Sequence, residues 1–136
     1  MYEVFEHTAD LGLRVRADTL DELFSEAARG LFSIIVSRLE DVRPRLAKTV
    51  TLEGEEVDYL LFDWLNELLF TFDTERLLLA EFDVRVATGS LRATCRGELL
   101  DADRHSPDRE IKAITYHGLQ VRQESEGWLA EVIVDL

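Results

Sequence analysis

The sequence predicts an α+β fold in which two helices pack on one face of a mixed, largely antiparallel β-sheet. Two segments place apolar residues at helical spacing, and most of the remaining chain alternates apolar and polar residues at period two. The last alternating segments are separated only by turns and one loop, which is typical of antiparallel strands rather than of βαβ units. At 136 residues, the chain is expected to form a single domain spanning residues 1–136.

The amino-terminal half predicts both helices. A short apolar stretch runs into a turn ending at Asp10, and alternation indicates a strand at residues 11–16. Thr19 and Glu22 then form the signature of a capping box, after which apolar residues recur at helical spacing as far as Val36. Residues 46–52 alternate again. The second helix is expected to begin near Glu55, with an apolar stripe that includes Trp64 and is typical of a buried core.

The carboxy-terminal half predicts strands only. Residues 82–86 and 91–99 alternate on either side of Thr88-Gly-Ser, which is typical of a hairpin turn. A polar loop follows at residues 101–110, then a segment at residues 111–121 and a final strand that begins at Trp128.

Composition narrows the classes of function. The net charge of −13 and the lack of a basic stretch with interleaved aromatic residues argue against direct, tight binding of nucleic acid. An acidic surface suits solubility, cation binding or docking on a basic partner. No apolar run reaches the length of a membrane span, no secretory signal opens the chain, and Cys95 has no partner for a disulfide. We therefore expect a cytoplasmic protein.

Common catalytic motifs are absent from the sequence. There is no phosphate-binding loop with Gly-rich spacing, and Cys95 falls within a predicted strand. His7, His105 and His117 are scattered, so a zinc site would require the fold to bring them together. His105 lies in a polar, acidic loop, where solvation is the simpler expectation.

A candidate metal site is found at the ends of two segments. The last strand closes at Asp135, beside the main-chain carboxylate of Leu136, and the first segment closes at Asp10. Crowded carboxylates resist joint ionisation unless a cation joins them, and oxygen ligands suit a hard divalent ion. The alternative is a frayed terminus with a solvated aspartate, and an Asp10 that caps local backbone amides.

Lys112 is the candidate cationic residue. The chain has thirteen arginines but only two lysines, and an ammonium, unlike a guanidinium, is a compact point charge. The other lysine, Lys48, falls in an alternating stretch and is expected to face solvent. The alternative for Lys112 is an ordinary lysine whose stem covers apolar surface.

Several blocks together resemble the archease family. They are FEHTADLGL (residues 5–13), TLDELF (19–24), LLFDWLNELL (60–69), Gly97-Glu with Asp101 and His105, EIKAITYH (110–117) and the closing VDL (134–136). The resemblance covers essentially the whole chain in the expected order, and no block departs from the family pattern.

The resemblance implies a function that composition does not reveal. Archeases are protein cofactors of the RtcB-type tRNA-splicing RNA ligase; they promote its guanylylation and multiple turnover, can broaden its nucleotide use, and are not themselves ligases. The family's divalent-metal site, associated with calcium although magnesium or manganese would also suit it, carries over onto Asp10, Asp135 and Leu136. A lysine implicated in activation points to Lys112.

Two other functions remain open at this stage. A general chaperone or adaptor for RNA-modifying enzymes, such as tRNA methyltransferases, would need the acidic surface but not the metal site. A hydrolase using a metal at Asp10 and Asp135 is the other alternative, although no separate base or nucleophile is evident beside them.

Overall fold

The computed structural model describes residues 1–7 and 10–136 and has an α+β fold, as predicted. Its elements are β1 (Tyr2–His7), β2 (Asp10–Ala17), α1 (Leu20–Ile35), a short 3-10 turn η1 (Leu39–Asp41), β3 (Leu46–Glu53), α2 (Val57–Glu75), β4 (Leu77–Ala87), β5 (Ser90–Leu99), β6 (Ala113–Glu124) and β7 (Gly127–Asp135). None of the helices in these residues combines the length and apolarity needed to cross a membrane.

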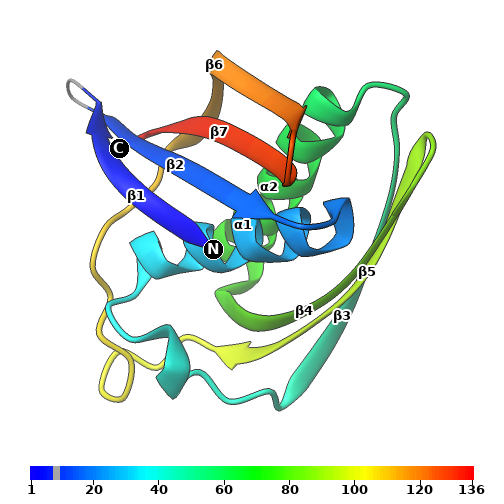
Figure 1. The fold of residues 1–136 in the computed structure, drawn as a ribbon. Helices are drawn as coiled ribbons and strands as arrows, with labels where there is room; N and C mark the ends of the chain where they lie inside the picture. Colours follow the sequence, from blue (N-terminus) through cyan, green and yellow to red (C-terminus); the bar gives the residue numbers. More distant parts are fainter. Residues whose placement is uncertain (8–9) are drawn as a thin grey trace.

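The strands form two sheets, whereas the sequence predicted one. Sheet 1 has the order β1-β2-β7-β6 and sheet 2 the order β3-β5-β4, and every strand pairing among the described residues is antiparallel. The two helices lie between the sheets (Figure 1). Alternation identifies strands but not their partners, because pairing depends on contacts between residues far apart in the chain.

Helix α1 is buried from two sides, which explains why its apolar stripe is so broad. On one side Gly30 packs against Leu13 of β2, where a Cβ atom would come within 2.5 Å of the leucine side chain. On the other side Phe32 stacks on Phe82 of β4, with ring centroids 6.1 Å apart. A helix between two sheets needs apolar residues around much of its circumference, not along a single face.

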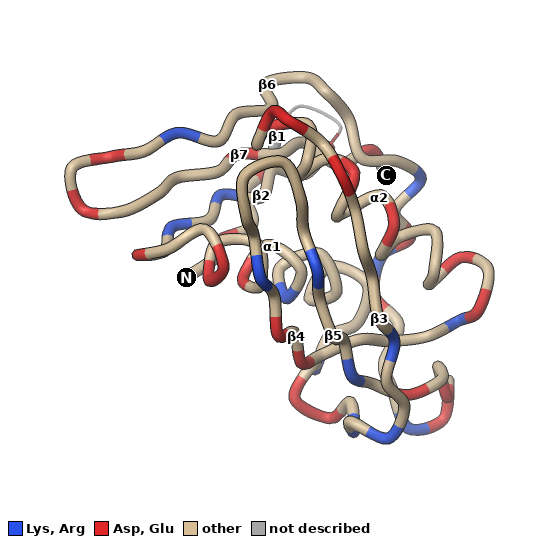
Figure 2. Tube along the Cα trace, turned by 90° about the vertical axis from the view of Figure 1, so that its right-hand side faces the viewer, with Lys and Arg blue, Asp and Glu red and all other residues tan. Residues whose placement is uncertain are grey.

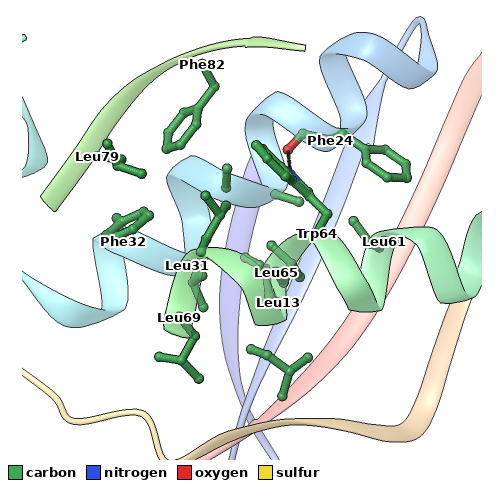
Figure 3. Close-up of a cluster of buried hydrophobic side chains, with 14 of the residues drawn as sticks. Leu13, Phe24, Leu31, Phe32, Leu61, Trp64, Leu65, Leu69, Leu79 and Phe82 are labelled. Atoms are coloured by element: carbon green, nitrogen blue, oxygen red, sulfur yellow. Dashed lines mark hydrogen bonds between the residues drawn. The ribbon is translucent and has the colours of Figure 1, made fainter. Parts of the chain in front are cut away.

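Helix α2 joins the same core. The Trp64 indole N–H donates a hydrogen bond to the Phe24 carbonyl at 2.9 Å, and Figure 3 shows the surrounding cluster of side chains from both helices, β2 and β4. Trp64 is fully buried. One continuous core therefore holds both sheets against the helices.

The local signals at the helix and hairpin ends are confirmed. The Glu22 N–H donates to the Thr19 hydroxyl at 3.2 Å, so Thr19 caps α1. Helix α2 begins at Val57, close to the predicted position. The turn between β4 and β5 contains Gly89 with φ at +79°, a conformation that glycine adopts without strain.

Two strands depart by more than one residue from their predicted bounds, and the first is β4, which was expected at residues 82–86 and runs from Leu77 to Ala87. The segment expected at residues 111–121 becomes β6, which begins at Ala113, reaches Glu124 and loses its register with β7 between Thr115 and Gln120. In β7, both faces are largely buried, including Ile133. Ile133 pairs with Gly12, and the Phe5 ring lies so close over Gly12 that a Cβ atom there would be 2.1 Å from it.

Candidate functional site

The three candidate segments meet at one end of sheet 1. Asp10 opens β2 and Asp135 closes β7, and the pairing of Leu11 with Val134 places Asp10 opposite Asp135 when the antiparallel register is continued by one residue. On the other side of β7, the Lys112 N–H donates to the Asp135 carbonyl at 2.8 Å. In Figure 1 the carboxy terminus lies near the start of β2.

The candidate ligands at this end are all oxygen donors. Asp135 is exposed and Asp10 half-buried, and Leu136 follows Asp135 directly. Within residues 1–7 and 10–136, no three histidine, cysteine, aspartate or glutamate side chains gather as metal ligands. A cation here would therefore rely on two aspartates and the main-chain carboxylate of Leu136, a donor set that fits a hard ion such as calcium.

The amino-terminal motif is only partly described. His7 pairs with Asp10 across the β1–β2 hairpin. Thr8 and Ala9, which complete the His-Thr-Ala-Asp sequence, lie outside the described residues.

Lys112 lies at the edge of an acidic cavity. Its exposed side chain and the outer side of α2 line an open cavity of about 500 Å³, to which Asp63, Glu67 and Asp73 contribute carboxylates. Among the described residues no carboxylate forms an ion pair with Lys112. Its ammonium is therefore available to an external anionic group.

Lys48 has a different environment from that predicted. It is half-buried rather than solvent-facing, and its ammonium pairs with Glu75 of α2 at 2.7 Å. Within the described part of the chain the two lysines thus differ, because Lys48 has an ion-pair partner and Lys112 has none.

A buried polar cluster was missed by sequence reasoning. Glu98, only 6% exposed, accepts hydrogen bonds from the Arg43 N–H at 2.7 Å and from His105 Nε2 at 3.0 Å, and it forms an ion pair with Arg104. The expectation that His105 is solvated is wrong, since its side chain is 3% exposed. Glu98 occupies a polar position in the alternating pattern of β5, so the sequence pattern does not indicate that it is buried.

The electrostatics of this cluster follow from its hydrogen bonds. The Asp101 N–H donates to His105 Nδ1 at 2.9 Å, so Nδ1 carries no proton and Nε2–H donates to Glu98. Burial opposes ionisation of Glu98, but the hydrogen bonds from Arg104, Arg43 and His105 outweigh it and lower the pKa of Glu98 to about 2. The cluster is an internal brace, not a site open to a ligand.

Cys95 has no features of a reactive thiol. It is fully buried in β5, and burial raises its pKa to about 12. A thiolate at this position is therefore strongly disfavoured, in keeping with the absence of a catalytic cysteine motif in the sequence.

The chain is similar to known proteins along its whole length. Residues 2–136 match the model of the Archease protein family (MTH1598/TM1083). The protein archease of Methanopyrus kandleri is 40% identical over 139 residues, covering 99% of both chains. The solution structure of Methanobacterium thermoautotrophicum protein 1598 superimposes with a TM-score of 0.88 at 34% identity, covering 99% of this chain and 98% of that one. The crystal structure of an archease, described as a possible chaperone, from Thermotoga maritima has the same fold, with a TM-score of 0.67 at 22% identity, and covers 100% of this chain and 98% of that one. This chain belongs to the archease family.

Proposed function

We propose that this protein activates an RtcB-type tRNA-splicing RNA ligase, promoting guanylylation of the ligase and its multiple turnover. In this role it is a cytoplasmic protein cofactor that performs no ligation itself. Membership of the archease family supports the proposal. The observation that carries it is Lys112, whose main-chain N–H bonds to Asp135 opposite Asp10 and whose ammonium forms no ion pair among the described residues.

The residues at this end of sheet 1 have separable roles in the proposal. Asp10, Asp135 and the main-chain carboxylate of Leu136 would hold a divalent cation, calcium being our first choice and magnesium or manganese the others. Such an ion, when bound, supplies positive charge for neutralising phosphate oxygens. Lys112 extends towards α2 and would contact a phosphate group or a carboxylate of the ligase as a point charge.

Activation requires a difference in affinity between ligase states. A bound protein shifts an equilibrium only if it binds one state more tightly than the other. Guanylylation depends on positioning and neutralising a triphosphate, so a cationic side chain at the mouth of the ligase would favour the state that accepts the nucleotide. Lys112 is our candidate for this role, because among the described residues no carboxylate forms an ion pair with it.

A titration of the cognate ligase with this protein tests the proposal. Catalytic amounts should convert the ligase from about one turnover to many and should speed its guanylylation, while the protein alone should ligate nothing. The same titration with heat-unfolded protein controls for nonspecific effects. Unchanged ligase turnover across the titration would reject the proposed function.

A second candidate is a chaperone or adaptor for RNA-modifying enzymes such as tRNA methyltransferases. The description of the Thermotoga maritima archease as a possible chaperone favours it. A chaperone would raise the yield of active enzyme during refolding without altering the turnover of enzyme that is already folded. Assays on pre-folded ligase therefore separate the two functions.

A further inference from the structure

Helix α2 carries a stripe of side chains that is exposed in the part of the chain that the structure describes. Tyr59, Asp63, Asn66, Phe70 and Asp73 are exposed and follow one another at spacings of three and four residues, so they share one face of the helix. Tyr59 is 52% and Phe70 62% exposed, which is unusual for large aromatic side chains. Asp63, Phe70 and Asp73 also line the cavity that contains Lys112, so the stripe adjoins the candidate site.

A break in β6 adds a third aromatic side chain to this face. The pairing of β6 with β7 is lost between Thr115 and Gln120, and Gly118 within the break has φ at +66°. Irregularities of this kind redirect side chains out of the regular alternation. Tyr116, 60% exposed, stacks on Phe62 of α2 with ring centroids 3.9 Å apart, which leaves its other face exposed.

The rings form one wall of a hollow whose rim is acidic. Tyr116 meets Tyr59 edge to face at 5.8 Å, and both line an open hollow of about 450 Å³ together with Glu56 and Asp58. No lysine, arginine or histidine lines it, and in the described part of the chain neither Glu56 nor Asp58 has an ion-pair partner. The hollow therefore offers aromatic faces and uncompensated negative charge side by side.

We propose that this face of α2 and β6 is a docking surface for an arginine-bearing basic segment on the surface of the RNA ligase. The inference rests on the proposed function, because it names the ligase as the partner. A guanidinium can stack on an exposed tyrosine ring and at the same time bond a carboxylate. A phosphate backbone does not fit, because Glu56 and Asp58 would repel it. A purely apolar partner would leave the same carboxylates without compensation.

In this proposal, docking on the ligase and activation of the ligase depend on different residues. Tyr116 and Tyr59 would determine how tightly the ligase binds, whereas Lys112 would act on the bound ligase. A docking variant should therefore raise the concentration needed for half-maximal activation, and a Lys112 variant should lower the maximum.

The test measures binding of the full-length protein to its cognate ligase by biolayer interferometry. Tyr116→Ala should weaken binding by about ten-fold, and Tyr116→Phe, which keeps the ring, should stay within about two-fold of the unaltered protein. Leu99→Ala is the matched control, because Leu99 is 56% exposed but lies at the end of β5. It should bind as the unaltered protein does.

A charge variant keeps the test independent of the aromatic packing. Glu56→Gln combined with Asp58→Asn removes two exposed or half-exposed charges without altering the core, and it should weaken binding and flatten its dependence on salt. If the unaltered protein activates the ligase, and both this variant and Tyr116→Ala bind the ligase as tightly as it does, the docking surface is overturned and the proposed function stands. The docking surface would also be overturned if the unaltered protein self-associates and Tyr116→Ala makes it monomeric. The face would then be an interface between two copies of this chain. An unaltered protein that neither binds nor activates the ligase would overturn the proposed function and, with it, this inference.

Discussion

At the scale of single residues, the contrast between the two lysines gives the sharpest prediction. Lys112 has no ion-pair partner among the described residues, whereas Lys48 is paired with Glu75. Both Lys112→Ala and Lys112→Arg should impair activation of the ligase, because a planar guanidinium cannot replace a compact ammonium in a tight contact with phosphate or carboxylate. Either change should alter the free energy of unfolding by no more than about 0.5 kcal/mol.

The matched control for this prediction is Lys48→Arg, which changes the other lysine and should leave activation intact. Guanylylation rate, cation affinity and melting temperature are measured on the same set of proteins. Full activation by Lys112→Arg would show that only a positive charge is needed. Full activation by Lys112→Ala would remove Lys112 from the site.

The aspartates at the end of sheet 1 give a second prediction at this scale. Asp10→Asn and Asp135→Asn keep the shape of each side chain but remove one anionic ligand, and each should lower the affinity for Ca²⁺ or Mn²⁺ by about ten-fold or more in titration calorimetry. Asp103→Asn removes an exposed aspartate in the loop after β5 and is the control. Unchanged affinity in both site variants would exclude a metal site at these positions.

At the scale of elements, the buried Glu98 cluster joins the end of β5 to two loops. Glu98 accepts from the main chain at Arg43, which precedes β3, and from His105 in the loop that leads to β6. Arg104 extends the connection by donating to the Asp41 carbonyl at 2.9 Å. Main-chain hydrogen bonds also tie the second loop to the end of α1, as in Asp108 N–H to the Ile35 carbonyl, and the cluster adds the link from both loops to sheet 2.

The cluster predicts a component of acid sensitivity. The pKa of Glu98 in the folded protein, about 2, is below its ordinary value of 4.5, so ionised Glu98 favours the folded state. This stabilisation is fully present above about pH 4.5 and is lost as the pH falls towards 2. Glu98→Gln should lower the free energy of unfolding at pH 7 by about 1–3 kcal/mol, and its deficit relative to the unaltered protein should shrink on acidification.

Urea denaturation between pH 7 and pH 2.5 measures this deficit directly. Glu126→Gln, a change in the exposed turn between β6 and β7, controls for the loss of one surface charge and should show no deficit larger than about 0.5 kcal/mol. A Glu98→Gln deficit that stays constant with pH would mean that the ionisation of Glu98 does not contribute.

The spacing of apolar residues predicted the helices, strands and turns well, but it predicted the burial and strand register of particular residues less well. The capping residue Thr19, the stripe of α2 and the turn at Gly89 are local features, and each is where the sequence indicated. The burial of His105 was missed because it depends on Glu98 and Asp101, whose positions are set by the loop conformation. The break in β6 was missed for a similar reason, since Gly118 signals a turn only when the register with β7 is known.

At the scale of the whole molecule, the assembly of the candidate site depends on long-range strand pairing. Asp10 and Asp135 come from opposite ends of the chain, and β2 and β7 bring them together by pairing as neighbours in sheet 1. From the sequence alone, their convergence was a hypothesis based on the chemistry of carboxylates. The position of Lys112 on the other side of β7 could not be inferred from spacing, because β6 was first expected to begin at Ile111 and its register was unknown.

Charge at this scale is distributed rather than divided into two poles. Figure 2 shows acidic residues spread along much of the trace, with basic residues recurring among the strands of sheet 2. The net charge of −13 is therefore not gathered into one dominant acidic pole. The docking that we propose for a basic segment therefore depends on a local arrangement, the aromatic and acidic face of α2.

The helical layer between the two sheets predicts that the molecule unfolds as one unit. Helix α1 packs on β2 in one sheet and on β4 in the other, so neither sheet can lose its partners without exposing the shared core. Two tryptophans report on different parts of this arrangement, because Trp64 lies in the helical layer and Trp128 in β7 of sheet 1.

The variants Trp64→Phe and Trp128→Phe each keep one tryptophan. In each variant, the fluorescence of the remaining indole should give the same urea midpoint as far-ultraviolet circular dichroism. Trp64→Phe should itself be less stable by about 1–3 kcal/mol, because the buried Phe24 carbonyl loses its hydrogen bond from the indole. A Trp128 transition that precedes the loss of circular dichroism would show that sheet 1 unfolds separately, and that the helices stabilise sheet 2 without it.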